Sequence, residues 1–288
     1  MKGFAIAGHI AVDHVITLDG EYSQLGGPPS FASALGKTLD FPVNVVTKIG
    51  TGFPEEFKEL LTQLGIAVNP SSYPTTRFII DYRHEPRAMS VPSKCEPIQI
   101  EEVLGSDRLL ICPIVDEIND NLLEQVNPDF LAMDPQGLLR EISVDHKVNP
   151  RNWHNLKILK KLDLLKTSKS EHHLITGCSD IQSSLRKIVE SGVGTAVITD
   201  GVHGSFVMTE GASLKVPSYH VEVVDSTGAG DVFISGLAAY LNDGLEWACA
   251  VASAASSAIV ETHGPKIECT GKEIMQRAYE IRENIQRL

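Results

Sequence analysis

The sequence predicts an α/β protein with a doubly wound, mostly parallel sheet, helices on both of its faces and a small β lid. Short apolar, β-branched runs alternate with amphipathic stretches over almost all of the 288 residues. Alternation of this kind is typical of a parallel sheet covered by helices. One region in the first third shows no helical pattern, and there we expect the lid.

Six short apolar runs are expected to form the strands of the sheet. They are Phe4–Ala7, Val43–Thr47, Arg108–Cys112, Phe130–Met133, Leu162–Leu165 and Ala196–Thr199. The clearest helix between them covers residues 54–64. Pro54 suits a first helical position and Gly65 can end the helix, while the apolar residues between them fall on one face.

The last third departs from simple alternation. Gly204–Met208 and Ser213–Pro217 are joined by a short turn and are predicted to form a hairpin. Three helical stretches follow, at Gly228–Leu241, Leu245–Glu261 and Gly271–Gln286.

The region without helices contains two extended segments, Thr75–Tyr82 and Arg87–Val91, separated by charged turn residues. We interpret them as a small β subdomain that projects from the sheet and is completed by Ala11–Leu18. The alternative is an edge hairpin of the main sheet. Since the chain shows no repeat, no low-complexity tract and no interdomain linker, we expect a single domain over residues 1–288, with a lid from about 11–18 and 75–91 inserted within it.

The charge balance excludes one class of partner. The chain has 37 acidic and 25 basic residues and a formal net charge of −12. Nucleic-acid binders usually show a basic footprint, so we expect no nucleic-acid partner. A small anionic ligand remains compatible with this charge, because it needs only a few aimed donors.

Cysteine usage and hydropathy indicate the compartment. The five cysteines are scattered, odd in number and without a C-x-x-C pair, which is typical of reduced thiols in a cytosolic protein. Gly8, His9 and Asp13 interrupt the N-terminal apolar run, and no apolar segment reaches membrane-spanning length. We therefore expect a soluble, cytoplasmic protein without a membrane partner. The choice between monomer and homodimer stays open.

Two familiar nucleotide motifs are absent. Gly36-Lys37-Thr38 resembles the end of a phosphate-binding P-loop, but Phe31 stands where the leading glycine would be, and the segment has the pattern of a helix interior. No G-x-G-x-x-G opens a helix after a strand. A nucleotide site in this chain must be built differently.

The strongest local motif is Asp225-Ser226-Thr227-Gly228-Ala229-Gly230-Asp231, which follows an extended apolar run and opens a helix. Small residues let the backbone approach a ligand closely, and the N–H groups at a helix start attract anions. A transferred phosphoryl group needs such donors, and a carboxylate beside them could accept the proton of an attacking hydroxyl. The alternative is that Asp231 only complements the helix dipole and that the glycines only form a turn.

A second motif, Gly26-Gly27-Pro28-Pro29, forms a tight turn before a helix soon after the first strand. Adjacent glycines permit a polyol to approach the backbone, and Asp13 is an acceptor of the right kind for sugar hydroxyls. The alternatives are a plain loop and a solvated aspartate at a strand end.

Together these segments resemble the PfkB/ribokinase family of carbohydrate kinases. Asp13, the Gly26-Gly27 pair and the segment from Asp225 to Asp231 occur in the family's order and at its usual spacing. The segment from Thr199 to Gly204 resembles the family's T-x-G-x-x-G nucleotide segment. The similarity covers nearly the whole chain. It implies a ribokinase-like fold and an ATP-dependent phosphotransferase with an alcohol group as acceptor.

The resemblance also implies roles for individual residues. Asp231 would be the catalytic base. The anion hole would be the backbone of Gly228, Ala229 and Gly230. The acceptor's hydroxyls would be bound by Asp13, Gly26 and Gly27. The nucleotide would be bound by Thr199, Gly201, Gly204, Lys166 and Ser168.

The same resemblance implies Mg²⁺ and a monovalent cation, K⁺, beside ATP. Asp225 and Thr227 match positions that hold the monovalent cation in many members. Ser168 replaces the asparagine of the family's N-x-x-E motif, so only Glu171 carries over the indirect Mg²⁺ role. Phe31 replaces an asparagine of many sugar kinases, and an aromatic ring cannot make that hydrogen bond. This argues against a ribose- or fructose-type pose.

These departures resemble the myo-inositol kinase branch. The segment from Gly26 to Ser33 is similar to its G-G-x-x-[SA]-F-x-S, and Asp134-Pro135-Gln136-Gly137 with Arg140 to its D-x-Q-[AG]-x-x-R. Phe31 could cover the apolar face of a cyclitol, while Asp134 and Gln136 bind its hydroxyl rim. The alternative is that Phe31 is a core residue of its helix.

Three rival functions remain. A nucleoside kinase or another sugar kinase would use the same fold and the same base. A non-catalytic ligand-binding relative belongs to another class, and the intact Gly-Ala-Gly-Asp segment argues against it, because a relative without activity would be expected to lose the base first.

Overall fold

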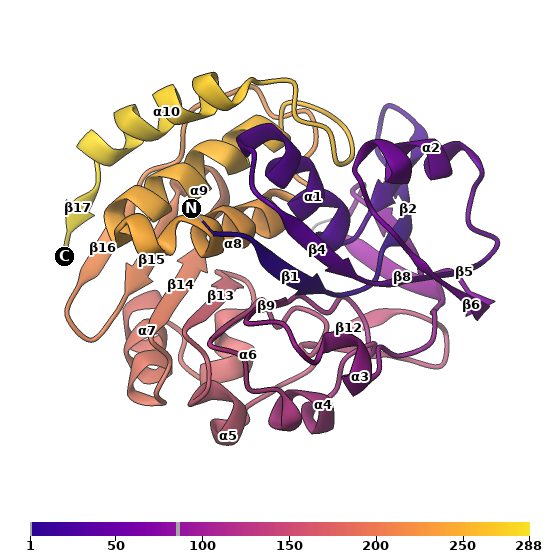
Figure 1. The fold of residues 1–288 in the computed structure, drawn as a ribbon, viewed down its shortest axis with the longest axis horizontal. Helices are drawn as coiled ribbons and strands as arrows, with labels where there is room; N and C mark the ends of the chain where they lie inside the picture. Colours follow the sequence, from indigo (N-terminus) through magenta and orange to yellow (C-terminus); the bar gives the residue numbers. More distant parts are fainter. Residues whose placement is uncertain (1, 85–86) are drawn as a thin grey trace.

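The computed structural model describes residues 2–84 and 87–288. It contains a large twisted sheet with helices on both sides and a smaller sheet set beside one end of it (Figure 1). Within the described residues the large sheet has the strand order β17-β16-β15-β14-β13-β10-β9-β1-β4. The predicted α/β fold with a mostly parallel sheet is confirmed.

The central strands of the large sheet run parallel. They are β1 (Phe4–Ala7), β4 (Val43–Val46), β9 (Arg108–Ile111), β10 (Phe130–Met133), β13 (Leu164–Ser168) and β14 (Thr195–Thr199). Three antiparallel strands extend one edge: β15 (Ser205–Met208), β16 (Ser213–Val216) and β17 (Gln286–Arg287). The predicted hairpin is therefore confirmed.

The helices cover the two faces of this sheet. One face carries α1 (Pro28–Leu39), α8 (Ala229–Tyr240), α9 (Leu245–Ile259) and α10 (Gly271–Glu283). The other carries α3 (Ile100–Val103), α4 (Asp120–Gln125), α5 (Leu156–Leu159), α6 (His172–Thr176) and α7 (Ile181–Glu190). Residues of β1 alternate between the two cores: Phe4 and Ile6 pack on the first, Ala5 and Ala7 on the second. A strand covered on both faces is apolar throughout, as the sequence pattern indicated.

One predicted strand is placed too early. The sequence favoured Leu162–Leu165, whereas β13 covers Leu164–Ser168. The pattern stopped at Leu165 because a lysine follows. Lys166 nevertheless lies inside the sheet, since its ammonium group forms an ion pair with Asp134.

The helix-free region forms a separate sheet. Its strand order is β3 (Glu21–Gly26), β2 (Ala11–Ile16), β7 (Arg77–Asp81), β8 (Ala88–Ser93). The alternative of an edge hairpin on the main sheet is wrong, and β3 was missed because most of its residues are polar. Residues 85–86 of the predicted lid lie outside the described residues.

Further short elements flank this sheet. They are α2 (Glu56–Gln63), β5 (Lys48–Thr51), β6 (Asn69–Pro74), β11 (Arg140–Ile142) and β12 (Val148–Pro150). Helix α2 agrees with the predicted helix at 54–64, with one to two residues fewer at each end.

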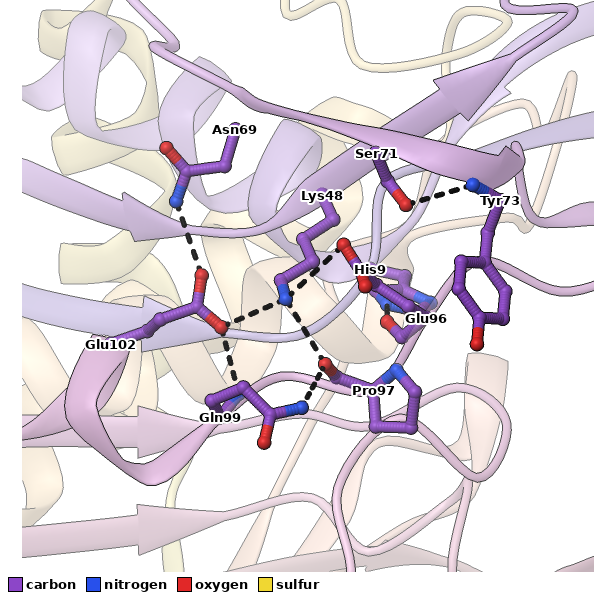
Figure 2. Close-up of polar contacts among 9 residues, drawn as sticks. All are labelled: His9, Lys48, Asn69, Ser71, Tyr73, Glu96, Pro97, Gln99 and Glu102. Carbon is purple, nitrogen blue, oxygen red and sulfur yellow. Dashed lines mark hydrogen bonds and ion pairs between the residues drawn. The ribbon is translucent and has the colours of Figure 1, made fainter.

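A polar network ties together the chain crossings between the two sheets (Figure 2). His9, which is completely buried after β1, has Nδ1 2.9 Å from Thr76 Oγ1 and Nε2 2.9 Å from the Glu96 carbonyl oxygen. Beside it, Lys48 Nζ lies 3.1 Å from Glu102 and 3.5 Å from Glu96. These contacts join segments before β2, before β7 and after β8, and so hold the base of the small sheet in place.

None of the described helices is both long and apolar enough to cross a bilayer. All five cysteines are unpaired.

Candidate active site

A cavity of about 290 Å³ lies between the small sheet, the start of α1 and the start of α8. Its lining includes thirteen of the predicted site residues: Asp13, Gly27, Phe31, Asp134, Gln136, Lys166, Ser168, Glu171, Thr199, Thr227, Gly228, Gly230 and Asp231. Asp134 directly follows β10, at the carboxyl end of that parallel strand. This is the edge at which open α/β sheets usually bind ligands.

The start of α8 forms one wall of this cavity. Gly228 precedes the helix in the left-handed conformation, with φ 81° and ψ −7°, and no side chain caps the helix. Gly228 and Gly230 both line the cavity. We call residues 227–230 the glycine turn. The first N–H groups of a helix have no partner inside the helix, so this turn presents donors and a positive dipole end to a ligand.

Asp231 lies in the first turn of α8 and lines the same cavity. Its pKa is raised to about 7, mainly by burial and further by the charge of Asp134, while Lys166 and Arg140 oppose the rise. Gln136 Nε2 donates a hydrogen bond of 3.3 Å to Asp231 Oδ1. A carboxylate with a pKa near neutrality, directed into a cavity, is suited to general-base catalysis.

A buried ion pair packs against this wall and also lines the cavity. Lys166 Nζ lies 2.5 Å from Asp134 Oδ2, and both side chains are almost completely buried. Burial lowers the pKa of Lys166, but the charges of Asp134, Asp231 and Glu171 together raise it, so the ammonium group stays protonated. A Cβ at Gly230 would lie 2.4 Å from Lys166 Nζ, so the missing side chain there makes room for the ammonium group.

Asp13 and the glycine pair form the opposite wall. The pKa of Asp13 is raised to about 7, first by burial and then by the charge of Asp225, against the attraction of Arg140 and Arg87. A Cβ at Gly26 would lie 2.1 Å from Asp13 Oδ2, and one at Gly27 would lie 2.2 Å from the His9 carbonyl oxygen. Close packing therefore requires glycine at both positions.

Several cavity residues were not predicted as site residues. Arg140 Nη2 donates to Gln136 Oε1 at 2.9 Å, and Nη1 to the Ile114 carbonyl oxygen at 2.8 Å. The segment from Asp134 to Arg140 contained the signal, but Arg140 appeared there only as part of a motif. The small sheet adds Phe78, Ile80, Arg87 and Met89 to the lining. The alternating apolar residues of β7 were the available sign of this apolar wall.

Phe31 lines the cavity but has none of its surface exposed, and it packs in the core of the α1 and α8 face. This agrees with the alternative interpretation, in which Phe31 is a core residue of its helix. Its expected contact with a substrate stays a prediction.

A second cavity of about 470 Å³ adjoins the first. Thr199, Ser226 and Gly230 line both. The rest of the second lining is largely apolar and comes from β14–β15, the segment before the glycine turn, α8 and α9; it includes Gly201, Val202, Gly204, Tyr219, Val221, Phe233 and Val260. The predicted nucleotide residues are thus divided between the cavities: Gly201 and Gly204 line the second, Lys166 and Ser168 line the first, and Thr199 lines both.

The predicted cation ligands lie at the cavity margin. Ser168 Oγ donates to Glu171 Oε2, and both residues line the first cavity. Asp225 Oδ1 accepts from the Thr227 backbone N–H at 2.8 Å. Thr227 Oγ1 is buried and has no hydrogen-bond partner among the described residues, which fits an absent ligand such as a cation. The described residues contain no group of three or more His, Cys, Asp or Glu side chains that could hold a metal ion.

The chain resembles known sugar and nucleoside kinases. Residues 142–270 match the family model described as pfkB family carbohydrate kinase. The cytidine kinase of Thermococcus kodakarensis is 27% identical over 253 residues, which cover 83% of this chain and 88% of the relative. A ribokinase of Staphylococcus aureus is 28% identical over 38% of each chain.

Solved structures share the fold over almost its whole length. A pyrophosphate-dependent kinase in the ribokinase family, complexed with a pyrophosphate analogue and myo-inositol, has a TM-score of 0.76 at 21% identity, covering 94% of this chain and 99% of the other. The nucleoside kinase of Methanocaldococcus jannaschii has a TM-score of 0.75 at 18% identity, covering 97% and 99%.

The fold is thus ribokinase-like, and the class of protein is a phosphotransferase with an alcohol group as acceptor. The similarity to the pfkB family model covers residues 142–270, and solved structures of the same fold include an Arabidopsis thaliana ribokinase complexed with ribose and ATP.

Proposed function

We propose that this protein transfers the γ-phosphoryl group of ATP to a hydroxyl of myo-inositol or a close cyclitol. The observation that carries the proposal is the first cavity, whose small volume is lined by Asp231, the glycine turn and Asp13. The acceptor would lie between Asp13 and Asp231. The phosphates would reach Gly230 from the second cavity, because Gly230 lines both.

The proposed reaction follows from this placement. Asp231, in its ionised form, accepts the proton of the attacking hydroxyl as its oxygen bonds to the γ-phosphorus, while the bond from that phosphorus to the bridging oxygen breaks and ADP leaves. The helix-start N–H groups of the glycine turn stabilise the charge on the transferring oxygens. Glu171, with Ser168, would hold Mg²⁺ near the phosphates, where it would neutralise part of their charge. Asp225 and Thr227 would hold a monovalent cation such as K⁺ beside the turn.

The second cavity supports ATP rather than pyrophosphate as donor. Its lining is largely apolar and it has a volume of about 470 Å³. An adenine nucleoside would bury apolar surface there, whereas pyrophosphate has no group to fill it. This distinguishes the chain's proposed donor from that of the pyrophosphate-dependent neighbour.

The first cavity supports a small neutral acceptor. Its volume of about 290 Å³ is at the lower limit for ligand pockets. Arg140 is directed to Gln136 and Ile114, Arg87 to Tyr82, and Lys166 to Asp134. The Arg140 guanidinium and the Lys166 ammonium therefore already have partners, whereas Arg87 contacts only the neutral hydroxyl of Tyr82. The apolar wall of Phe78, Ile80 and Met89 suits the C–H face of a cyclitol.

A nucleoside kinase is the second candidate, because a relative that covers 83% of this chain is a cytidine kinase. A nucleoside is larger than a cyclitol, so it would fill more of the first cavity, which the small sheet borders. We propose that this sheet acts as a lid over the acceptor, within a single domain.

Free cysteines and acidic charge support a cytoplasmic location.

The test is kcat/KM for myo-inositol against ribose, fructose, cytidine, adenosine and guanosine, each with ATP and with pyrophosphate. We expect myo-inositol with ATP to give the highest value. A tenfold preference for any sugar or nucleoside, about 1.4 kcal/mol of transition-state stabilisation, would refute the cyclitol assignment. A preference for pyrophosphate would refute the donor assignment. In both cases the kinase assignment would stand.

A further inference from the structure

The ring of Phe31 lies directly against the glycine turn. A Cβ at Gly228 would lie 2.2 Å from Phe31 Cδ1 and 2.3 Å from Phe31 Cε1. Carbon atoms that are not bonded do not approach this closely. As long as Phe31 keeps its place, position 228 therefore accepts only glycine, independently of the positive φ of that residue.

A second contact fixes the same two helices farther along. A Cβ at Gly236 of α8 would lie 3.5 Å from Leu35 Cδ2 of α1 and 3.2 Å from Ala252 Cα of α9. Phe31 and Leu35 are one turn apart on α1, and both are completely buried. Helix α1 thus packs against α8 at Gly228 and Gly236. If α1 shifted along α8, both contacts would break.

Side-chain hydrogen bonds support only part of the glycine turn: the Thr227 N–H donates to Asp225 Oδ1 at 2.8 Å, and Ser256 Oγ donates to the Ala229 carbonyl oxygen at 2.9 Å. Its helix lacks a capping side chain, and the hydrogen bond from the Ala229 N–H to the Ser226 carbonyl oxygen is long, at 3.4 Å. A turn without a cap needs packing to keep its N–H groups in one direction. Phe31 supplies that packing from the side of α1.

We propose that Phe31 is a positioning residue for phosphoryl transfer. It follows Gly27 by one helical turn and touches Gly228, so it sets the distance between the acceptor site and the anion hole. Small errors in that distance cost rate, because transfer requires the reacting atoms to be held close and aligned. The inference rests on the proposed function, but it assigns Phe31 to the turn and not to the substrate.

The first test is Phe31→Leu, with Phe4→Leu as the matched control. Phe4 is a buried phenylalanine of the same core and does not line either cavity. Phe31→Leu is expected to lower kcat by about 10- to 100-fold, with KM values for ATP and acceptor changing less than about threefold. Phe4→Leu should lower the melting temperature by a similar amount while kcat stays within about twofold. Equal kcat values for the two variants would overturn the proposal.

The second test is a double-mutant cycle between Phe31→Ala and Gly228→Ala. In the wild-type background, the alanine at 228 meets the ring and also adopts a strained φ. In the Phe31→Ala background only the strain remains. Gly228→Ala should therefore cost at least about fivefold less activity there, since residues in contact are not additive. Losses that simply multiply would show that the ring does not hold the turn.

A binding measurement separates failure of this inference from failure of the proposed function. If the wild type phosphorylated none of the acceptors, the proposed function would fail. Pyrophosphate affinity by calorimetry and the amide NMR signals of Gly228 and Gly230 would still report on the turn. Phe31→Leu should weaken pyrophosphate binding and shift both signals, and Phe4→Leu should do neither. Unchanged binding and signals in Phe31→Leu would overturn the positioning role alone.

Discussion

Helices α1 and α8 begin in similar ways on opposite sides of one cavity. Each is preceded by a glycine with positive φ, 89° at Gly27 and 81° at Gly228, and neither start has a side-chain cap. At both glycines an added Cβ would collide with neighbouring atoms, the His9 carbonyl oxygen in one case and the Phe31 ring in the other.

The two starts differ in their N–H groups. Helix α1 opens with Pro28 and Pro29, which have no N–H, and the next amide, of Ser30, bonds to the Gly27 carbonyl oxygen. Helix α8 opens with Ala229 and Gly230, which keep theirs. A helix start without N–H groups cannot stabilise an anion, whereas one with them can. The comparison explains how one cavity could hold a neutral polyol on one side and a phosphoryl group on the other.

The largest expected effect concerns the carboxylate of the α8 start. Asp231→Asn keeps the shape of the side chain but removes the base, so kcat should fall by about 10²- to 10⁴-fold with little change in ATP affinity. Asp129→Asn, at an exposed position, is the control. Steady-state kinetics of both variants is the measurement, and a variant Asp231→Asn that kept most of its turnover would refute the assignment of the base.

The next largest effect is expected for a variant whose α8 start resembles the α1 start. Gly230→Pro removes one N–H group, as Pro29 does in α1, and the loss of one anion-hole donor typically lowers kcat by about 10²- to 10³-fold. Gly230→Ala is the matched control, because it brings the same Cβ toward Lys166 but keeps the N–H group. We expect kcat of the proline variant to be far below that of the alanine variant. Similar values would mean that this N–H group does not contribute.

A smaller effect is expected in the pH dependence of kcat/KM, which reports on the carboxylates of the two cavity walls. Asp13 and Asp231 both have a pKa raised to about 7. The ionised forms bind and activate the acceptor, so kcat/KM for the acceptor should rise with pH up to about 7 and level off above it. In Asp13→Asn the rise should become shallower, since one titrating group is gone. A profile that is flat between about pH 5.5 and 8 would contradict both assignments.

The smallest expected effect concerns the four-stranded sheet. If it is a lid, a saturating acceptor should slow hydrogen exchange of backbone amides in β2, β7 and β8, while amides of the large sheet change little. Exchange measured by mass spectrometry with and without myo-inositol tests this. Identical exchange in the three strands would argue against a lid.

Much of this arrangement could be predicted from the sequence. The parallel strands are apolar on both faces, so their runs were visible. The glycine turn with Asp231 combines small residues, a strand end and a helix start, which is a distinctive local pattern. Strand β3 was not predicted, because most of its residues are polar. Its antiparallel pairing with β2 also depends on the turn between the two strands.

Contacts between distant segments were beyond the sequence patterns. Arg140 donates to the carbonyl oxygen of Ile114, 26 positions earlier in the chain, and no local spacing predicts that partner. The placement of Phe31 against Gly228 joins residues almost two hundred positions apart in the chain. Lys166 was expected at the nucleotide, but its buried ion pair with Asp134, 32 positions earlier in the chain, was not predicted. These contacts depend on how the elements pack in the folded protein.

The most direct test of the account is a crystal structure of Asp231→Asn with myo-inositol and a non-hydrolysable ATP analogue. We expect one hydroxyl oxygen of the cyclitol within about 2.6–3.2 Å of the residue 231 side chain. A second hydroxyl should contact Asp13, and the terminal phosphate should lie on the N–H groups of the glycine turn. A cyclitol bound away from the α1 and α8 starts, or a phosphate that does not touch the turn, would contradict the account.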